Sequence, residues 1–251
     1  GMFIGVDYPS VLGAGAPKTN NGKLRAKGWE LALNWNDQVG QVRYNIGASL
    51  SDAWSKVLEL TNNENVPNPG KNTSRLINKP INAIYVYQTD GIFQSDAEAA
   101  AYVNSKGERL QPDAKAGDIR FKDVDNNGSI DSGDKVYSGS GIPKVEANLS
   151  FSGSYKNFDL SFQFGSAWGN KLYNVNRLYY EGMDAGRNYF TSTLDAWTPG
   201  NTGADIPSAV LGDPNENTRE SDRFLENGNF VRLRQLQLGY TLSKAVAKKM
   251  Y

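Results

Sequence analysis

VEANLSFSGSYKNFDLSFQFGSAW, residues 145–168, is the stretch of this chain that decides the fold. In its first half, apolar and polar residues alternate with a period of two, and one face carries Val145, Ala147, Leu149, Phe151 and Tyr155. The alternation resumes after Lys156-Asn157, where one face carries Phe158, Leu160, Phe162 and Phe164. This periodicity predicts two antiparallel strands joined by a tight turn.

Two folds fit this hairpin. Each predicted strand is about ten residues long, close to the roughly 9–11 residues that a tilted strand needs to cross a bilayer. An aromatic-rich face opposite a face of small polar residues suits a transmembrane barrel, with lipid outside and water inside. The same pattern also suits a soluble β-sandwich with one buried and one wet face. The hairpin alone does not distinguish the two.

A second hairpin is predicted over residues 29–51, where two alternating segments flank a short polar turn at 36–40. Trp29 and Trp54 lie near its outer ends, as the aromatic girdles of a barrel would. A further strand is expected at residues 236–242, with a bulge at 233–235, where the alternation slips. Residues 3–8 indicate the end of one more strand before a loop.

The alternation is largely lost in two long segments, residues 55–143 and 169–229, which we interpret as elaborated loops. Within the first, residues 84–88 resemble a strand, and residues 96–103 resemble a short helix capped by Ser95 or Asp96. Short turns on one side and long loops on the other are typical of outer-membrane barrels. The asymmetry favours a barrel and predicts that both long loops lie on the extracellular side.

Composition excludes several functions. The 251 residues carry 27 basic and 27 acidic side chains, so a net charge of zero gives no indication of nucleic-acid binding. The chain has no cysteine and no histidine, which excludes thiolate metal sites, a zinc hydrolase centre and a serine–histidine triad. No carboxylate pair has a catalytic motif, and we expect no enzymatic activity. The first residues do not resemble a signal peptide, and no apolar run is long enough for a membrane helix.

One constellation predicts a metal site. Residues 123–134, DVDNNGSIDSGD, match the spacing of a calcium-binding loop. Oxygen side chains fall at the ligand positions, and Ser129 would contribute its backbone carbonyl; the predicted ligands are Asp123, Asp125, Asn127, Ser129, Asp131 and Asp134. Aspartate replaces the usual glutamate at the last position, which predicts weak binding. The alternative is a polar Asp/Asn/Gly turn without metal. The flanking residues resemble strands, which favours a structural clip over a sensor.

Four aromatic residues at and beyond the end of residues 145–168 are candidates for stacking on sugar rings: Trp168, Tyr173, Tyr179 and Tyr180. Such residues more often belong to an interfacial belt or to loop packing.

A resemblance rests on several strings taken in order. They are NGKLRAKGWEL (21–31), YQTDGIFQS (87–95), GDIRFKD (117–123), GIPK (141–144), NFDL (157–160), WGN (168–170), FVRLRQL (230–236) and GYTL (239–242). Together they resemble the C-terminal part of SusC/RagA-type TonB-dependent outer-membrane transporters of Bacteroidetes.

The resemblance implies import of large nutrients, glycans or peptides, through an outer-membrane barrel closed by a SusD-like lid lipoprotein and energised by TonB. The family's N-terminal plug and TonB box do not occur in residues 1–251, so we expect a partial barrel of about six strands that is incomplete, or soluble, by itself. The rival hypothesis is a soluble, calcium-dependent, carbohydrate-binding β-sandwich. In that fold the two hairpins would stack face to face across a core about 10 Å thick.

Overall fold

The structure, a computed structural model, describes residues 2–5, 18–60, 76–184 and 186–242, with side chains from residue 22 onward. The chain divides into two compact units. We call residues 24–56, 141–171 and 227–251 the strand unit, and residues 1–23, 57–140 and 172–226 the loop unit. No helix in the described ranges is long and apolar enough to cross a membrane.

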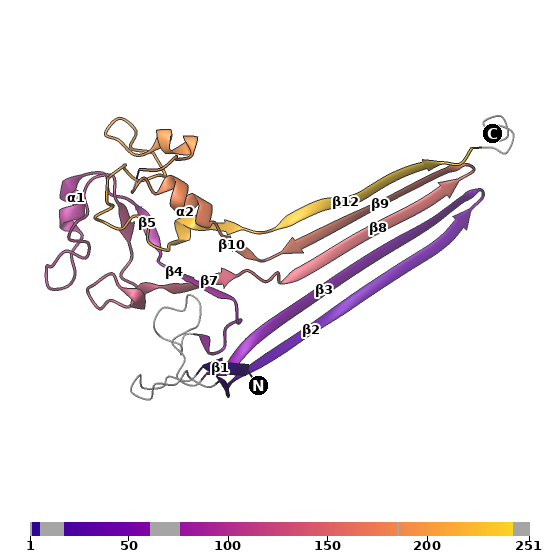
Figure 1. Ribbon diagram of the computed structural model, residues 1–251, viewed down its shortest axis with the longest axis horizontal. Helices are drawn as coiled ribbons and strands as arrows, with labels where there is room; N and C mark the ends of the chain where they lie inside the picture. The colour runs from indigo at the N-terminus through magenta and orange to yellow at the C-terminus, as the bar shows by residue number, and fades with distance from the viewer. Residues whose placement is uncertain (1, 6–17, 61–75, 185, 243–251) are drawn as a thin grey trace. The chain divides into compact units, whose positions relative to one another are not determined.

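The largest sheet has six strands in the order β1-β2-β3-β8-β9-β12, and most of its residues belong to the strand unit (Figure 1). Its strands are β1 (Met2–Gly5), β2 (Lys18–Val39), β3 (Val42–Leu60), β8 (Val145–Tyr155), β9 (Phe158–Trp168) and β12 (Phe230–Tyr240); β1, the first residues of β2 and the last residues of β3 fall in the loop unit. Because β3 pairs antiparallel with β8 along its length, the two predicted hairpins lie edge to edge in one sheet. They do not stack face to face, so the sandwich prediction for these hairpins is wrong.

The register of the sheet sorts its side chains by polarity. One row across four strands is apolar and consists of Ile46, Phe151, Phe162 and Leu236. The row beside it is polar and consists of Asn45, Ser152, Ser161 and Gln237. Since successive side chains point to opposite faces of a strand, the sheet has one apolar and one polar face.

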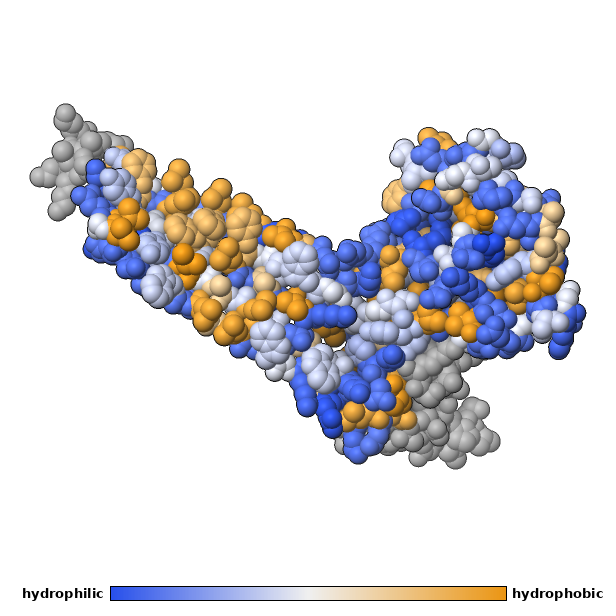
Figure 2. Space-filling model, turned by 180° about the vertical axis from the view of Figure 1, so that it is seen from behind, coloured by the Kyte–Doolittle hydropathy of each residue, from blue (hydrophilic) through white to orange (hydrophobic). Residues whose placement is uncertain are grey.

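The apolar face of the strand unit is not covered by other described residues. Leu33 is 61% exposed, Trp35 63% and Leu238 74%. Figure 2 shows apolar side chains gathered along the long strands. In water, exposed apolar area of this extent would be unfavourable by about 25 cal/mol per Å². An exposed apolar face of this kind is what the barrel prediction requires.

The turns and the bulge follow from local chemistry. The predicted turn at residues 36–40 is wrong in extent, because β2 continues to Val39 and the turn contains only Gly40 and Gln41. Gly40 has a φ of 60°, a conformation that glycine adopts without steric cost, so the strands can pair up to the turn itself. The predicted bulge in β12 is confirmed by a register shift between Leu233 and Gln235. Residues 6–8 of the predicted first strand lie outside the described residues.

The loop unit contains short elements around a buried core. They are β4 (Ala83–Val86), β5 (Thr89–Ile92), α1 (Asp96–Ala101), β6 (Ile119–Phe121), η3 (Ser132–Asp134), β7 (Val136–Ser140), β10 (Lys171–Tyr173), α2 (Val175–Glu181), η4 (Thr191–Asp195), η5 (Asp222–Phe224) and β11 (Leu225–Asn227). Strands β4 and β7, β5 and β6, and β10 and β11 form two-stranded sheets. Phe93, Phe121 and Phe224 have no exposed surface. The predicted helix is confirmed, with Ser95 as its N-cap, although it ends at Ala101.

Buried amide side chains hold residues 213–219 against strand β6. Asn217 Oδ1 accepts a hydrogen bond from the Ile119 backbone at 2.8 Å. Gln111 Nε2 and Asn215 Nδ2 both donate to the Ile119 carbonyl, at 2.9 and 3.1 Å. Gln111 Oε1 accepts from the Phe121 backbone at 2.8 Å. Among the described strands β6 pairs only with β5, and these side chains satisfy backbone groups that the pairing leaves free. They thereby hold the strand that directly precedes the aspartate loop.

Candidate functional site

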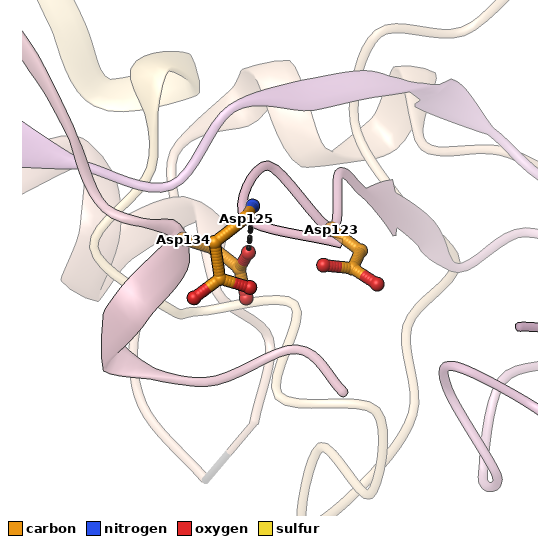
Figure 3. Close-up of side chains that lie close together, drawn as sticks. All are labelled: Asp123, Asp125 and Asp134. Carbon is orange, nitrogen blue, oxygen red and sulfur yellow. Dashed lines mark hydrogen bonds between the residues drawn. The ribbon is translucent and has the colours of Figure 1, made fainter. Parts of the chain in front are cut away.

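The aspartate loop connects β6 to β7 and brings three of its acidic side chains together. Carboxylate oxygens of Asp123, Asp125 and Asp134 all lie within 4.8 Å of one another. Figure 3 shows the three side chains converging from the two ends of the loop. Asp134 is completely buried, although it is an acid in a polar loop. Carboxylate oxygens at this spacing are the ligands that calcium prefers.

The first half of the loop is shaped by Asp123. Its Oδ1 accepts from the Asn127 backbone at 3.2 Å, and its Oδ2 accepts from the Gly128 backbone at 2.9 Å. Gly128 has a φ of 90°, which only glycine adopts without strain. The chain therefore turns sharply at the position where the calcium-loop pattern requires glycine.

The second half of the loop is closed by a reciprocal cap on η3. Asp131 Oδ1 accepts from the Gly133 backbone at 2.6 Å, and Asp134 Oδ2 accepts from the Asp131 backbone at 2.8 Å. Asp134 Oδ1 also accepts from the Val124 backbone at 2.7 Å. Asp134 thus ties the end of the loop to its beginning, and three backbone N–H groups contribute favourable partial charge around these carboxylates.

Asn127 lies between two of the acids. Its Nδ2 donates to Asp125 Oδ2 at 3.3 Å and to Asp131 Oδ2 at 3.2 Å, while its Oδ1 accepts from the Ser129 backbone at 2.9 Å. The amide hydrogens thus lie where they relieve repulsion between the two carboxylates. Asp131 joins the cluster through this amide and through its backbone contact with Asp134, and Ser129 joins through its backbone.

The surroundings of the loop combine aromatic and charged groups. Lys135 Nζ lies 2.7 Å from Glu220 Oε2 and 5.4 Å from the centre of the Tyr87 ring. Burial raises the pKa of the Tyr87 hydroxyl; the Arg219 guanidinium opposes this shift, and the Asp134 carboxylate adds to it. The flanking strands β6 and β7 occur as predicted, in place of the helices that flank the loop of an EF-hand. The aspartate loop thus connects two strands, β6 and β7.

The four candidate aromatics differ in exposure. Trp168, at the end of β9 in the strand unit, is 44% exposed. Tyr179 and Tyr180, on α2 in the loop unit, are 48% and 41% exposed. Tyr173 is packed differently, because its ring lies 6.2 Å from the ring of Phe224 and its hydroxyl is buried without a hydrogen-bond partner among the described residues. Burial raises the pKa of this hydroxyl, and the Tyr173 ring serves packing better than ligand stacking.

Sequence reasoning missed a second group of polar residues in the loop unit. Arg177 and Arg223 line one cleft, although 46 residues separate them along the chain. Neither belongs to a motif, and each is an isolated arginine in a loop-rich segment. Only the packing of α2 against η5 brings the two together.

Comparison with known proteins finds TonB-dependent receptors that are similar to this chain. No family model matches the chain. TonB-dependent receptor P26 of Formosa agariphila is 26% identical over 248 residues, covering 96% of this chain and 24% of the relative. TonB-dependent receptor SusC of Bacteroides thetaiotaomicron is 31% identical over 134 residues, covering 52% of this chain and 12% of the relative. The structure of the RagAB peptide transporter matches 98% of this chain with a TM-score of 0.69 at 22% identity, covering 26% of that chain.

The resemblance to SusC/RagA-type TonB-dependent receptors is confirmed. The relatives are receptors and not enzymes, in agreement with the expectation from composition. This chain spans about a quarter of the length of the P26 receptor that it matches, at 24%. The antiparallel strands of the SusC-type fold are present, and the described residues form an open sheet that does not close into a barrel.

Proposed function

We propose that this chain forms part of the wall and two outward loops of an outer-membrane importer of large nutrients, glycans or peptides. A TonB-type protein would energise the importer, and a SusD-like lipoprotein would close it. The observation that carries the proposal is the exposed apolar face of the strand unit, opposite a polar face in the same register. Strands β8, β9 and β12 each have 11 residues, which is about the length of a tilted transmembrane strand.

The polar face supports the same proposal. A depression of about 710 Å³ lies against residues of β2, β3, β8 and β9, among them Asn45, Ser152 and Ser161. Small and polar side chains of this kind line the water-filled interior of outer-membrane barrels. The register that produces the lipid-facing surface therefore also produces a surface suited to an aqueous lumen.

Topology can be tested by single-cysteine labelling, because the chain contains no native cysteine. In intact cells that produce the receptor, Ser105→Cys in the first long loop should react with a membrane-impermeant maleimide. Asn157→Cys, in the β8–β9 turn, should react only after the outer membrane is broken. Labelling of Asn157→Cys in intact cells would reverse the proposed orientation, and equal labelling of both before and after lysis would contradict membrane insertion.

The lipid-facing surface can be tested with neighbouring residues. Tryptophan placed at Phe162, on the apolar face, should be quenched by lipids brominated in the acyl chain. Tryptophan at Ser161, on the polar face of the same strand, should not be quenched. Native tryptophans are replaced by phenylalanine in both variants, so that one fluorophore reports. Equal quenching at the two positions would contradict the proposed barrel wall.

We further propose that the aspartate loop binds one calcium ion on the extracellular side, where it would fix the shape of the first long loop. Support comes from the three carboxylates within 4.8 Å and from the turn at Gly128. The ion would relieve repulsion among the acids, and the Asn127 amide would have to turn to present its oxygen. Because Asp134 already accepts three backbone hydrogen bonds, we expect weak binding, roughly 10⁻⁴–10⁻³ M.

Calorimetry with calcium tests this site directly. The unmodified receptor should release or absorb heat with a midpoint in that range, and Asp123→Ala combined with Asp125→Ala should abolish the signal. Asp113→Ala, an exposed aspartate of the same unit, is the matched control and should leave the signal unchanged. Equal heats from all three proteins would leave the loop as a polar turn.

A further inference from the structure

A cleft of about 440 Å³ opens in the loop unit and shares no residue with the aspartate loop. It is bounded by β5, β6, α2, η5 and the segment 202–205, and its polar lining includes Thr89, Gln94, Arg177, Thr202, Asp205 and Arg223. The volume falls in the range of small-ligand sites. A ligand portion the size of one amino acid or one sugar ring would fit.

Arg177 is already fully engaged by the protein. Its Nε and Nη2 donate to Glu181 Oε2 at 3.1 and 3.0 Å, and its Nη1 donates to the Arg223 carbonyl at 3.0 Å. Ser192 donates to the other carboxylate oxygen of Glu181 at 3.1 Å. Arg177 thus fixes helix α2 to η5, and Glu181 has little capacity left for a second arginine.

Arg223 differs from Arg177 because its guanidinium has no hydrogen-bond acceptor among the described residues. Its side chain is only 9% exposed. Its Nη2 lies 4.0 Å from Glu181 Oε2, which permits electrostatic attraction but is too long for a hydrogen bond. A buried donor without an acceptor is unfavourable, and more so when the group is charged. Because Arg223 lines the cleft, a ligand bound there could supply the hydrogen-bond acceptor that its guanidinium lacks.

The charges around the cleft single out Arg223 as its weakly paired cation. Arg177 has two acidic neighbours, since its Nη2 lies 3.0 Å from Glu181 Oε2 and its Nη1 lies 3.8 Å from Glu226 Oε1, whereas the carboxylate nearest to Arg223 is Glu181, at 4.0 Å. Burial lowers the pKa of Arg223 to about 10, and Glu181 opposes the shift, so the guanidinium remains charged at neutral pH. Asp205 also lines the cleft and would repel a doubly charged phosphate ester more strongly than a singly charged carboxylate.

We infer that this cleft binds the carboxylate group of a ligand, with Arg223 as its anchor. The planar guanidinium matches the two oxygens of a carboxylate and can donate two parallel hydrogen bonds to them. That the ligand is imported cargo rests on the proposed function. That the cleft binds a carboxylate rests on the cleft alone, and the experiments below test it without measuring transport.

The first arm of the test compares ligands that differ in one group. The receptor, purified in detergent, is titrated with N-acetyl-alanyl-alanine and with its C-terminal amide, and separately with glucuronate and with methyl glucoside. We expect at least one acid to bind about tenfold or more tightly than its neutral counterpart. A preference for the peptide acid or for glucuronate identifies the source of the carboxylate. Inorganic phosphate is titrated as well. The inference would be overturned if each acid bound no more tightly than its own neutral counterpart, or if phosphate bound more tightly than either acid.

The second arm compares two arginines. Arg223→Gln should weaken binding of the preferred acid about tenfold or more, which corresponds to about 1.4 kcal/mol. Arg187→Gln is the matched control, because Arg187 is exposed in the same unit and its guanidinium lies over the Tyr179 ring at 5.3 Å. Arg187→Gln should bind as the unmodified receptor does. Unchanged affinity in Arg223→Gln would overturn the inference.

A third arm leaves the arginine in place, so that loss of folding cannot imitate loss of the site. Gly203 lines the cleft, and a Cβ added there would have no heavy atom within 4 Å, so the Cβ of Gly203→Leu is tolerated and we expect the added side chain to obstruct the cleft. Gly200 lies just before the segment 202–205 and does not line the cleft; a Cβ there would meet only Thr198 Oγ1, at 3.9 Å, so Gly200→Leu serves as the control. Binding that survives Gly203→Leu contradicts the cleft. Maleimide labelling of the same proteins reports separately on the proposed membrane topology.

Discussion

The strand unit and the loop unit place phenylalanine in opposite environments. In the loop unit, Phe121 and Phe224 are fully buried among protein atoms. In the strand unit, Phe158 is 54% exposed, and its ring contacts Tyr240 at a centroid distance of 4.7 Å. The loop unit is therefore stabilised in water by its own core, whereas the strand unit leaves large apolar side chains exposed, as the proposed contact with lipid requires.

Removal of a phenyl ring should give the largest difference in stability effect between the two units. Phe224→Ala leaves a cavity in the loop-unit core, and we expect destabilisation of that unit by about 3–5 kcal/mol. Phe158→Ala removes a ring from a surface in contact with lipid and should have a much smaller effect, about 1 kcal/mol from the lost pair with Tyr240. Urea unfolding of the receptor in lipid vesicles, followed by amide exchange of each unit, measures both.

The result also tests the division into units. Exchange in Phe224→Ala should accelerate in residues 172–226, while strands β8 and β9 remain protected. Equal acceleration in both units would mean that they unfold together.

Charge on the sheet should have a slightly smaller effect that depends on the face. Phe162→Arg places a guanidinium in lipid and should destabilise the inserted receptor by about 2–4 kcal/mol. Ser161→Arg adds the same group to the polar face, beside the depression of about 710 Å³, and should be nearly neutral. Reversible urea unfolding in vesicles compares the two. Similar losses for both variants would show that the faces do not differ in solvent.

The difference between the units also explains how far sequence could predict the fold. In the strand unit, one face of the sheet is apolar and the other is polar, so apolar and polar residues alternate along each strand. The pairing of Phe151 with Phe162 follows from this alternation. The predicted turn at residues 36–40 begins too early, because polar residues such as Asn36 also occur inside a strand that has one polar face. In the loop unit, order comes from side-chain contacts between distant segments, such as Asn217 with the Ile119 backbone. No local pattern encodes such contacts.

The candidate sites follow the same division. The aspartate loop was predictable because its ligands lie within 12 consecutive positions, 123–134, and a local backbone conformation brings them together. The Arg223 cleft was not predictable, because five separate segments contribute to it. Tyr173 shows why candidate ligand-stacking residues were hard to select from sequence. An aromatic residue beyond the end of a hairpin gives the same sequence pattern whether it faces a ligand or, as Tyr173 does, packs on Phe224.

Gly133 tests whether the aspartate loop is held as tightly as a local motif should be. A Cβ at this position would lie 2.5 Å from Asp125 Oδ2 and 2.8 Å from Asp131 Oδ1, so Gly133→Ala must displace two proposed calcium ligands. We expect about 1–3 kcal/mol of destabilisation from overpacking and about tenfold weaker calcium binding. Gly203→Ala, which would meet no atom within 4 Å, is the control. Calcium heats that match in the two variants would contradict the proposed ligand set.

The smallest effect is expected at the start of α1, where local sequence and tertiary packing both act. Ser95 Oγ accepts from the Glu98 backbone at 3.1 Å, and Glu98 Oε2 accepts in return from the Gln94 backbone at 2.7 Å. A helix of six residues is not stable alone, so it depends on this cap and on Ala99, which is packed with Phe93 in the core.

Ser95→Ala removes the cap and should destabilise the helix by about 1 kcal/mol, whereas Ser95→Asp keeps an acceptor and should cost much less. A change of this size accelerates local opening by roughly fivefold, which amide exchange over residues 96–101 can resolve. If Ser95→Ala exchanges as slowly as the unmodified receptor, packing of Ala99 alone holds the helix. In that case the loop unit would depend on its core even where a local capping signal is present.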